Sequence, residues 1–148
     1  MIGFSKRTDY GFLALGFLAR LPEGQRANAR LLAETLGVPP ELMAKVLQSM
    51  AKVGFIGSQM GPGGGYNLVL SPSEISVADV IAAIEGPISL TQCLSPPDEC
   101  TLAECCTIRR PMGMIQEKLV ELLDSITLED MWSAHEGVEE HELSHIHG

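Results

Sequence analysis

The first third of the chain carries apolar residues at the spacing of three consecutive helices. This spacing predicts helices over residues 5–21, 28–36 and 39–53. Asn28 stands where an N-cap is expected, and Gly37 follows the last apolar residue of the second helix as a C-terminal signal. Only a tight turn separates the second and third helices, which predicts a helix-turn-helix.

Residues 55–70 change to a pattern typical of short strands. Two short runs flank the sequence GPGGG at 61–65, and this order predicts a β-hairpin with a glycine-rich turn. A helix-turn-helix followed by such a hairpin is the layout of a winged helix-turn-helix, whose second helix enters the major groove of DNA. The predicted fold class is therefore mainly α with a small β-hairpin.

The second half of the chain predicts a loop between two helices. Ser76 and Asp79 have the spacing of a capping box, which opens a short helix. Residues 88–107 have the composition of an irregular loop, and a long helix with an apolar stripe follows it. The stripe consists of Ile115, Leu119, Leu122 and Ile126. An apolar stripe on a projecting helix requires a partner, so we expect it to form a dimer interface.

Length and charge agree with one small domain and a C-terminal arm. The chain has 148 residues, 45% of them hydrophobic, which is enough for an independent core. Residues 1–75 carry seven Lys and Arg against five acids, whereas residues 76–148 carry three against fourteen. Double-stranded DNA, a polyanion, is therefore expected at the N-terminal end. The chain lacks a secretory signal and an apolar run of about 20 residues, so we expect a cytoplasmic protein with no membrane partner.

The organisation that follows has three regions. We assign residues 1–75 to a winged helix-turn-helix DNA-binding region and residues 76–134 to a cysteine-bearing loop and dimerisation helices. Residues 135–148 are expected to form a flexible polar tail that holds all four histidines. No Ser/His or Cys/His arrangement typical of a catalytic nucleophile stands out in the sequence, so we expect no enzyme.

Outward positions of the third predicted helix are candidates for reading DNA. Lys45 and Gln48 have groups that hydrogen-bond to base edges, and Lys52 suits phosphate. The small residues of the hairpin turn permit close approach of the backbone to a DNA strand. The candidate set is Ser5, Lys6, Asn28, Pro40, Lys45, Gln48, Lys52, Gly63 and Gly64, with Arg7, Arg26 and Arg30 extending the phosphate footprint. On pattern alone, a three-helix unit whose lysines are merely solvated fits equally well.

Four cysteines lie close together in the predicted loop: Cys93, Cys100, Cys105 and Cys106. Their spacing lacks the Cys-x-x-Cys pattern of zinc ribbons and thioredoxin-type sites. Several thiolates on an irregular loop suit an iron-sulfur cluster, 2Fe-2S or 4Fe-4S, because its iron demands soft ligands but leaves the loop length free. Adjacent Cys105 and Cys106 point different ways in most backbone conformations, so one of them is expected to bind. A zinc site and unligated thiols are the alternatives.

Taken together, these segments resemble the IscR/NsrR-type family of iron-sulfur transcriptional regulators, and most closely the regulators of SUF iron-sulfur assembly. The resemblance covers residues 5 to about 131. It rests on SKRTDYGFLAL, on the helix pair LLAETLGVPPELMAKVLQSMAKVGF, on GPGGGYNL, on ISVADVIAAIEGPISLTQC and on the set Cys93, Cys100 and Cys106. The combination of these motifs is highly specific.

The resemblance implies a winged-helix homodimer whose long C-terminal helix crosses to the partner. It also implies that Cys93, Cys100 and Cys106 bind the cluster, with Cys105 an alternative or a bystander. Asp9 matches an acidic position that in some relatives supplies the fourth ligand from the opposite subunit, and it is our candidate for that ligand. As a first-turn acid, Asp9 is equally well explained by the helix N-terminus.

Two departures from the family pattern bear on function. Arg109 stands where some relatives have a ligating His, and Met60 stands where many have Arg directly before the hairpin turn. Readout of the minor groove by an inserted Arg is therefore in doubt. The hypothesis is a repressor that senses cluster status and controls iron-sulfur assembly genes. Its alternatives are a nitric-oxide or redox sensor of the same family, a cluster-free thiol or zinc regulator, and a cluster scaffold or electron carrier that does not bind DNA.

Overall fold

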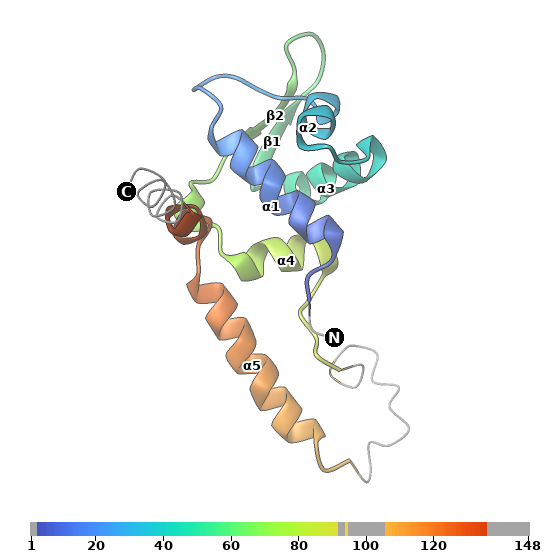
Figure 1. Cartoon of the computed structure of the whole chain (residues 1–148), viewed down its shortest axis with the longest axis vertical. Coiled ribbons are helices and arrows are strands. Elements are labelled where there is room, and N and C mark those ends of the chain that lie inside the picture. Colours follow the sequence, from blue (N-terminus) through green and yellow to red (C-terminus); the bar gives the residue numbers. More distant parts are fainter. Residues whose placement is uncertain (1–2, 92–93, 95–105, 136–148) are drawn as a thin grey trace, which may run out of the picture.

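The computed structural model describes residues 3–91, 94 and 106–135 (Figure 1). Their elements are, in chain order, α1 (Lys6–Ala19), α2 (Ala29–Leu36), α3 (Pro40–Lys52), β1 (Ile56–Gln59), β2 (Gly65–Leu68), the short 3-10 helix η1 (Pro72–Glu74), α4 (Val77–Glu85) and α5 (Arg109–Ser125). A further helical segment occupies residues 128–135. The predicted fold class, mainly helical with one antiparallel hairpin, is confirmed.

The helix ends have the caps that the sequence predicts. The Asn28 side chain accepts a hydrogen bond of 2.8 Å from the amide of Leu31 and so caps α2. At the other end of α2, Gly37 adopts the left-handed conformation with φ of 68°, which costs glycine little because it lacks a Cβ. These two local signals set the length of α2 and the direction in which the chain turns into α3.

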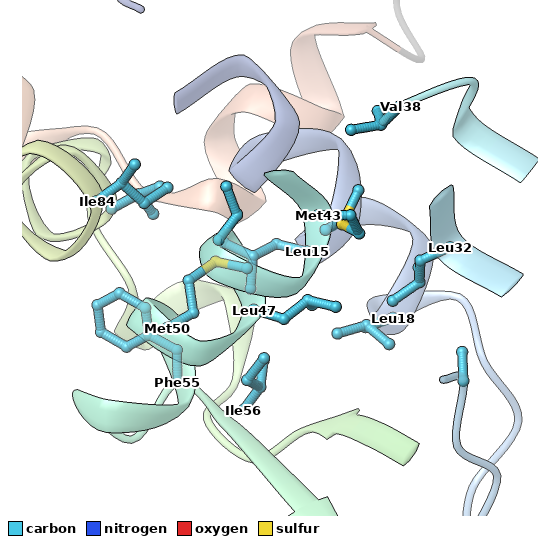
Figure 2. Close-up of a cluster of buried hydrophobic side chains, with 14 of the residues drawn as sticks. Leu15, Leu18, Leu32, Val38, Met43, Leu47, Met50, Phe55, Ile56 and Ile84 are labelled. Atoms are coloured by element: carbon cyan, nitrogen blue, oxygen red, sulfur yellow. The ribbon is translucent and has the colours of Figure 1, made fainter. Parts of the chain in front are cut away.

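The hydrophobic core lies where α1, α2 and α3 meet the hairpin. Figure 2 shows Leu15 and Leu18 of α1 facing Met43 and Leu47 of α3, and Leu15, Met43 and Leu47 are fully buried. The same cluster takes in Ile84 of α4. The core therefore continues past residue 75 into the C-terminal half of the chain.

The hairpin, which we call the wing, comprises β1, β2 and the turn between them. Its strands pair in antiparallel register from Ile56 with Leu68 to Gln59 with Gly65. Ala27, just before α2, joins the sheet by a bridge to Tyr66, with N–H to carbonyl distances of 3.0 Å and 2.8 Å. Tyr66 pairs with Ser58 next to the turn, so this bridge ties the turn end of the wing to the entry of α2 and the two elements keep a fixed relative position.

The chain that follows α5 returns to the start of α4. The amide of Leu128 donates to the Ile75 carbonyl at 3.0 Å, and the amide of Val77 donates to the Ile126 carbonyl at 2.8 Å. Leu128 is fully buried in the main core, whereas α5 itself extends away from the winged-helix unit (Figure 1). Among the described helices, none is long and apolar enough to cross a bilayer.

Candidate nucleic-acid interface and cysteine loop

The exposed face of α3 carries the predicted base-reading residues. Lys45, Gln48 and Lys52 are exposed, and Glu41 precedes them on the same side at helical spacing. The opposite face of the helix is anchored by buried residues, so the rigid core holds these side chains outward. Their common exposed face is confirmed, and their role toward DNA stays a prediction.

The N-terminus of α3 offers only a small set of amides. Pro39 and Pro40 have no N–H, no side chain caps this end, and the Met43 amide donates to the Pro39 carbonyl at 3.0 Å. The amides of Glu41 and Leu42 are therefore the donors left in the first turn. They suit an incoming phosphate, although the Glu41 carboxylate opposes a second negative charge there.

The predicted phosphate contacts around α2 differ in how their side chains are engaged. Arg30 forms an i to i+4 ion pair with Glu34, with 2.9 Å between Nε and Oε1, and both side chains are exposed. Part of the Arg30 charge is thus already balanced within the helix. Asn28 uses its side-chain oxygen as the cap, which leaves the amide nitrogen as the group suited to a phosphate oxygen.

The turn of the wing is tight and has no room for larger residues at its C-terminal side. Gly61 and Gly63 have φ of 91° and 73°, and the Gly64 amide donates to the Gly61 carbonyl at 2.9 Å. A Cβ on Gly64 would overlap the Gln59 and Gly61 carbonyl oxygens. Glycine is therefore required at 64 to close the turn, while Gly63 faces open space and leaves the backbone accessible.

The first turn of α1 is attached to the end of α4. The Glu85 carboxylate accepts a hydrogen bond of 3.0 Å from the Ser5 amide and one of 2.6 Å from the hydroxyl of Thr8, which is fully buried. Hydrogen bonding with the Ser5 side chain and with Thr8 lowers the pKa of Glu85 below its ordinary value of 4.5. Asp9 lies exposed in the same turn of α1.

The role of Glu85 was not predicted from the sequence. Glu85 lies 77 positions from Thr8, and no local pattern relates a glutamate at the end of one helix to the cap of another. Its one sequence signal is its place directly before Gly86, where the helix ends and the chain enters the cysteine loop. The contact therefore joins the beginning of that loop to the turn that carries Asp9.

The cysteine loop is only partly described. Cys93, Cys100 and Cys105 lie outside the described residues, and Cys106 is half-buried with a free thiol. Cys106 lines an open cavity of about 640 Å³ together with Leu94, Arg109, Arg110, Gly113, Met114 and Glu117. Within the described part of the chain no three potential metal ligands come together. Arg109 and Arg110 bring positive charge to the cavity lining, and Glu117 brings negative charge.

The predicted dimer stripe is largely exposed. None of the residues of α5 is buried, and Ile115 and Leu122 are 53% and 57% exposed. Leu119 is half-buried and lines a separate cavity of about 430 Å³ between the N-terminal segment, α4 and α5. Ile126 lies one residue beyond the helix in an extended conformation, because its carbonyl bonds to α4. Its assignment to the helical stripe was wrong for that reason.

A family model and a related protein both identify the same family. A family model described as Rrf2, an iron-dependent transcriptional regulator, matches residues 4–134. A helix-turn-helix transcriptional regulator of Rhodobacter capsulatus, named rrf2-like, is 32% identical over 127 residues, which cover 82% of this chain and 85% of that protein.

Two solved structures have the same fold. CymR, described as the global cysteine regulator of B. subtilis, is 26% identical with a TM-score of 0.68, over 90% of this chain and 98% of that one. IscR of T. potens is 25% identical with a TM-score of 0.67, over 93% of this chain and 90% of that one.

Proposed function

Since this chain belongs to the Rrf2 family of DNA-binding transcriptional regulators, we propose that it is a repressor that senses iron-sulfur status and controls genes of iron-sulfur assembly. The observation that carries the proposal is the thiol set of the loop. Cys93, Cys100 and Cys106 offer soft ligands of the kind that iron-sulfur clusters require, and the family is described as iron-dependent. Such a regulator acts in the cytoplasm, where its promoter DNA lies.

The donor set fits an iron-sulfur cluster chemically. Three thiolates come from one loop, and Asp9 is the candidate for a fourth ligand supplied by a second subunit. When bound, the cluster supplies a centre whose occupancy and redox state depend on iron supply and oxidants. Of the proposed thiolate ligands, Cys106 falls among the described residues, where it is half-buried beside Arg109 and Arg110.

A route from the loop to DNA runs through the attachment of α4 to α1. Glu85 precedes the loop directly and holds the first turn of α1 through Ser5 and Thr8. Helix α1 packs on α3 through Leu15 and Met43 in the common core. A displacement of the loop therefore reaches the DNA-reading helix through packed elements, and a coupling of about 1–3 kcal/mol changes DNA affinity by roughly 5- to 150-fold.

A homodimer is the second part of the proposal. Helix α5 has no buried residue and presents Ile115 and Leu122 more than half exposed, which favours a partner helix. Leu122→Asp introduces a charge into this surface, so sedimentation analysis is expected to show monomers, whereas the exposed-face control Glu121→Gln stays dimeric. A dimeric Leu122→Asp protein contradicts this interface.

The cluster is tested by anaerobic purification of the full chain, with iron and sulfide counting and a visible spectrum. The variant with Cys93, Cys100 and Cys106 replaced by Ser is expected to lose colour and iron, while the matched control Cys105→Ser keeps both. DNA binding by the two variants is then compared by mobility shift over a range of salt concentrations.

Three outcomes would each refute a different part of the proposed function. An iron-free wild-type protein that still binds DNA indicates a cluster-free thiol regulator. A protein with iron and sulfide but no DNA affinity indicates a scaffold or electron carrier. A triple variant that binds DNA like the wild type removes the cluster from regulation.

A further inference from the structure

We propose that Met60 is an apolar wedge that enters the minor groove of bound DNA beside the major groove occupied by α3. Met60 directly follows β1 at the tip of the wing and is 94% exposed, the largest exposure among the large apolar side chains of the described chain. The proposal rests on the DNA-binding function of the chain and is independent of the cluster.

The wing presents Met60 from a rigid support. The turn is closed by the hydrogen bond from the Gly64 amide to the Gly61 carbonyl, and the strands below it are paired in register. Close to the turn, the wing is joined to Ala27 through Tyr66, the partner of Ser58 in the hairpin. In Figure 1 the turn between β1 and β2 projects beyond α2 and α3. The tip therefore reaches past the helix-turn-helix while its direction stays fixed by the core.

The wing has no basic side chain with which to contact the phosphates of DNA. Residues 53–73 contain no Lys, Arg, Asp or Glu, so the wing cannot neutralise phosphates with a side chain. Gly61, Gly63 and Gly64 remove side-chain bulk from the turn and allow its backbone to come close to the DNA. Met60 is then the one long apolar side chain on the turn that can reach between the strands.

The geometry of duplex DNA places a minor groove next to the wing. Major and minor grooves alternate along the duplex, so an element that flanks a helix in the major groove meets the neighbouring minor groove, which is about 6 Å wide. A thioether side chain is unbranched and flexible enough for this width. Apolar side chains, Met among them, insert between base steps in that groove and kink the duplex.

A wedge at residue 60 predicts a preference for certain base steps at a position where no side chain hydrogen-bonds to the bases. Unstacking costs least at the pyrimidine–purine steps TA and CA/TG. We therefore expect such a step where the wing tip meets the DNA, outside the bases that α3 contacts. An Arg at residue 60 would instead respond to the negative potential of a narrow A-tract groove, so Met60 gives this chain a different target preference.

The test uses duplexes that the full-length protein selects from a randomised library. Affinity is measured over a range of salt concentrations, bending by energy transfer between the DNA ends, and unstacking by 2-aminopurine fluorescence at the predicted step. Met60→Ala is expected to lower affinity roughly 10-fold, in the range for loss of one specific contact, and to abolish bending and the fluorescence increase. The salt dependence is expected to stay unchanged, because no phosphate contact is lost.

Three further variants make the result specific. Met60→Leu is expected to keep bending, and Met60→Arg to steepen the slope of log K against log salt by about 0.9, as for one added phosphate contact. The matched control Met131→Ala removes an exposed methionine outside the DNA-binding half and is expected to bind like the wild type.

Straight DNA in the wild-type complex overturns the wedge, as does equal affinity and bending with Met60→Ala. A loss of affinity accompanied by a shallower salt slope overturns it too, because that result indicates a phosphate contact. If the wild-type protein selects no DNA, the DNA-binding function fails together with the wedge, and that outcome is distinct from selective binding without bending. Thermal unfolding of each variant checks that an exposed substitution leaves the fold intact.

Discussion

Replacing Thr8 by Val keeps the shape of a fully buried side chain and removes the hydroxyl that donates to Glu85 at 2.6 Å. A hydrogen bond to a charged group contributes about 1.5–3 kcal/mol to stability. Glu85 is exposed to water, which replaces the lost donor in part, so the expected cost of Thr8→Val is about 1 kcal/mol. For a chain of this size that corresponds to a decrease in Tm of roughly 2–4 °C.

Urea unfolding followed by circular dichroism at pH 7 measures this loss. The control Thr35→Val makes the same chemical change at an exposed position of α2 and is expected to alter the free energy of unfolding by less than about 0.5 kcal/mol. A double-mutant cycle of Thr8→Val with Glu85→Gln is expected to give a coupling energy of at least about 0.5 kcal/mol. A cycle without coupling, or a Thr8→Val protein as stable as the wild type, refutes the attachment of α4 to α1.

The same contact predicts a pH dependence with a definite sign. The pKa of Glu85 is lowered from 4.5 in the folded protein, first by hydrogen bonding with the Ser5 side chain and then with Thr8. A group whose pKa is depressed on folding stabilises the fold fully above its unfolded pKa. That stabilisation is lost as the pH falls below 4.5 and through the folded pKa. The stability difference between wild type and Glu85→Gln is therefore expected to shrink over this acidic range, and a difference that grows there contradicts the assignment.

Three other substitutions test the packing and the caps, each by urea unfolding. Leu47→Ala empties a fully buried position and is expected to cost about 2–5 kcal/mol; a cost below 1 kcal/mol would show that this site collapses around the cavity. Ser76→Ala removes both the cap of α4 and the 3.0 Å bond to Asp124, so a loss of about 1–2 kcal/mol is expected, and an unchanged midpoint argues against the capping box. Gly65→Ala strains a residue with φ of 133° and places a Cβ 2.7 Å from the Ala27 carbonyl carbon; a loss of at least about 1 kcal/mol is expected, more than for Gly24→Ala, which has open space around it.

Local signals predicted the local structure correctly. The Asn28 cap, the Gly37 terminator and the capping box at Ser76 each depend on residues three or four positions apart, so the sequence contains all the partners. Helical spacing likewise separated the exposed Lys45 and Gln48 from the buried face of α3. The candidate DNA-reading face was predictable because one helix supplies all of it.

Contacts between distant segments were not predictable in this way. Glu85 holds Thr8 across 77 positions, and Ala27 joins the wing through Tyr66. Helix α5 ends at Ser125, one residue before Ile126 of the predicted apolar stripe, because the Ile126 carbonyl bonds to α4. In each case the hydrogen-bond partner is determined by how two elements of structure pack against each other.

The sequence by itself determined which segments are helical, where they are capped, which face of α3 points outward and that the loop carries thiols, because these properties depend on neighbours along the chain. Only the tertiary structure decided that α4 is attached to α1, that the wing is fixed to the entry of α2 and that the Met60 side chain is almost fully exposed. These properties depend on the relative placement of elements, which is set by burial of a shared core and by hydrogen bonds between residues far apart in the chain.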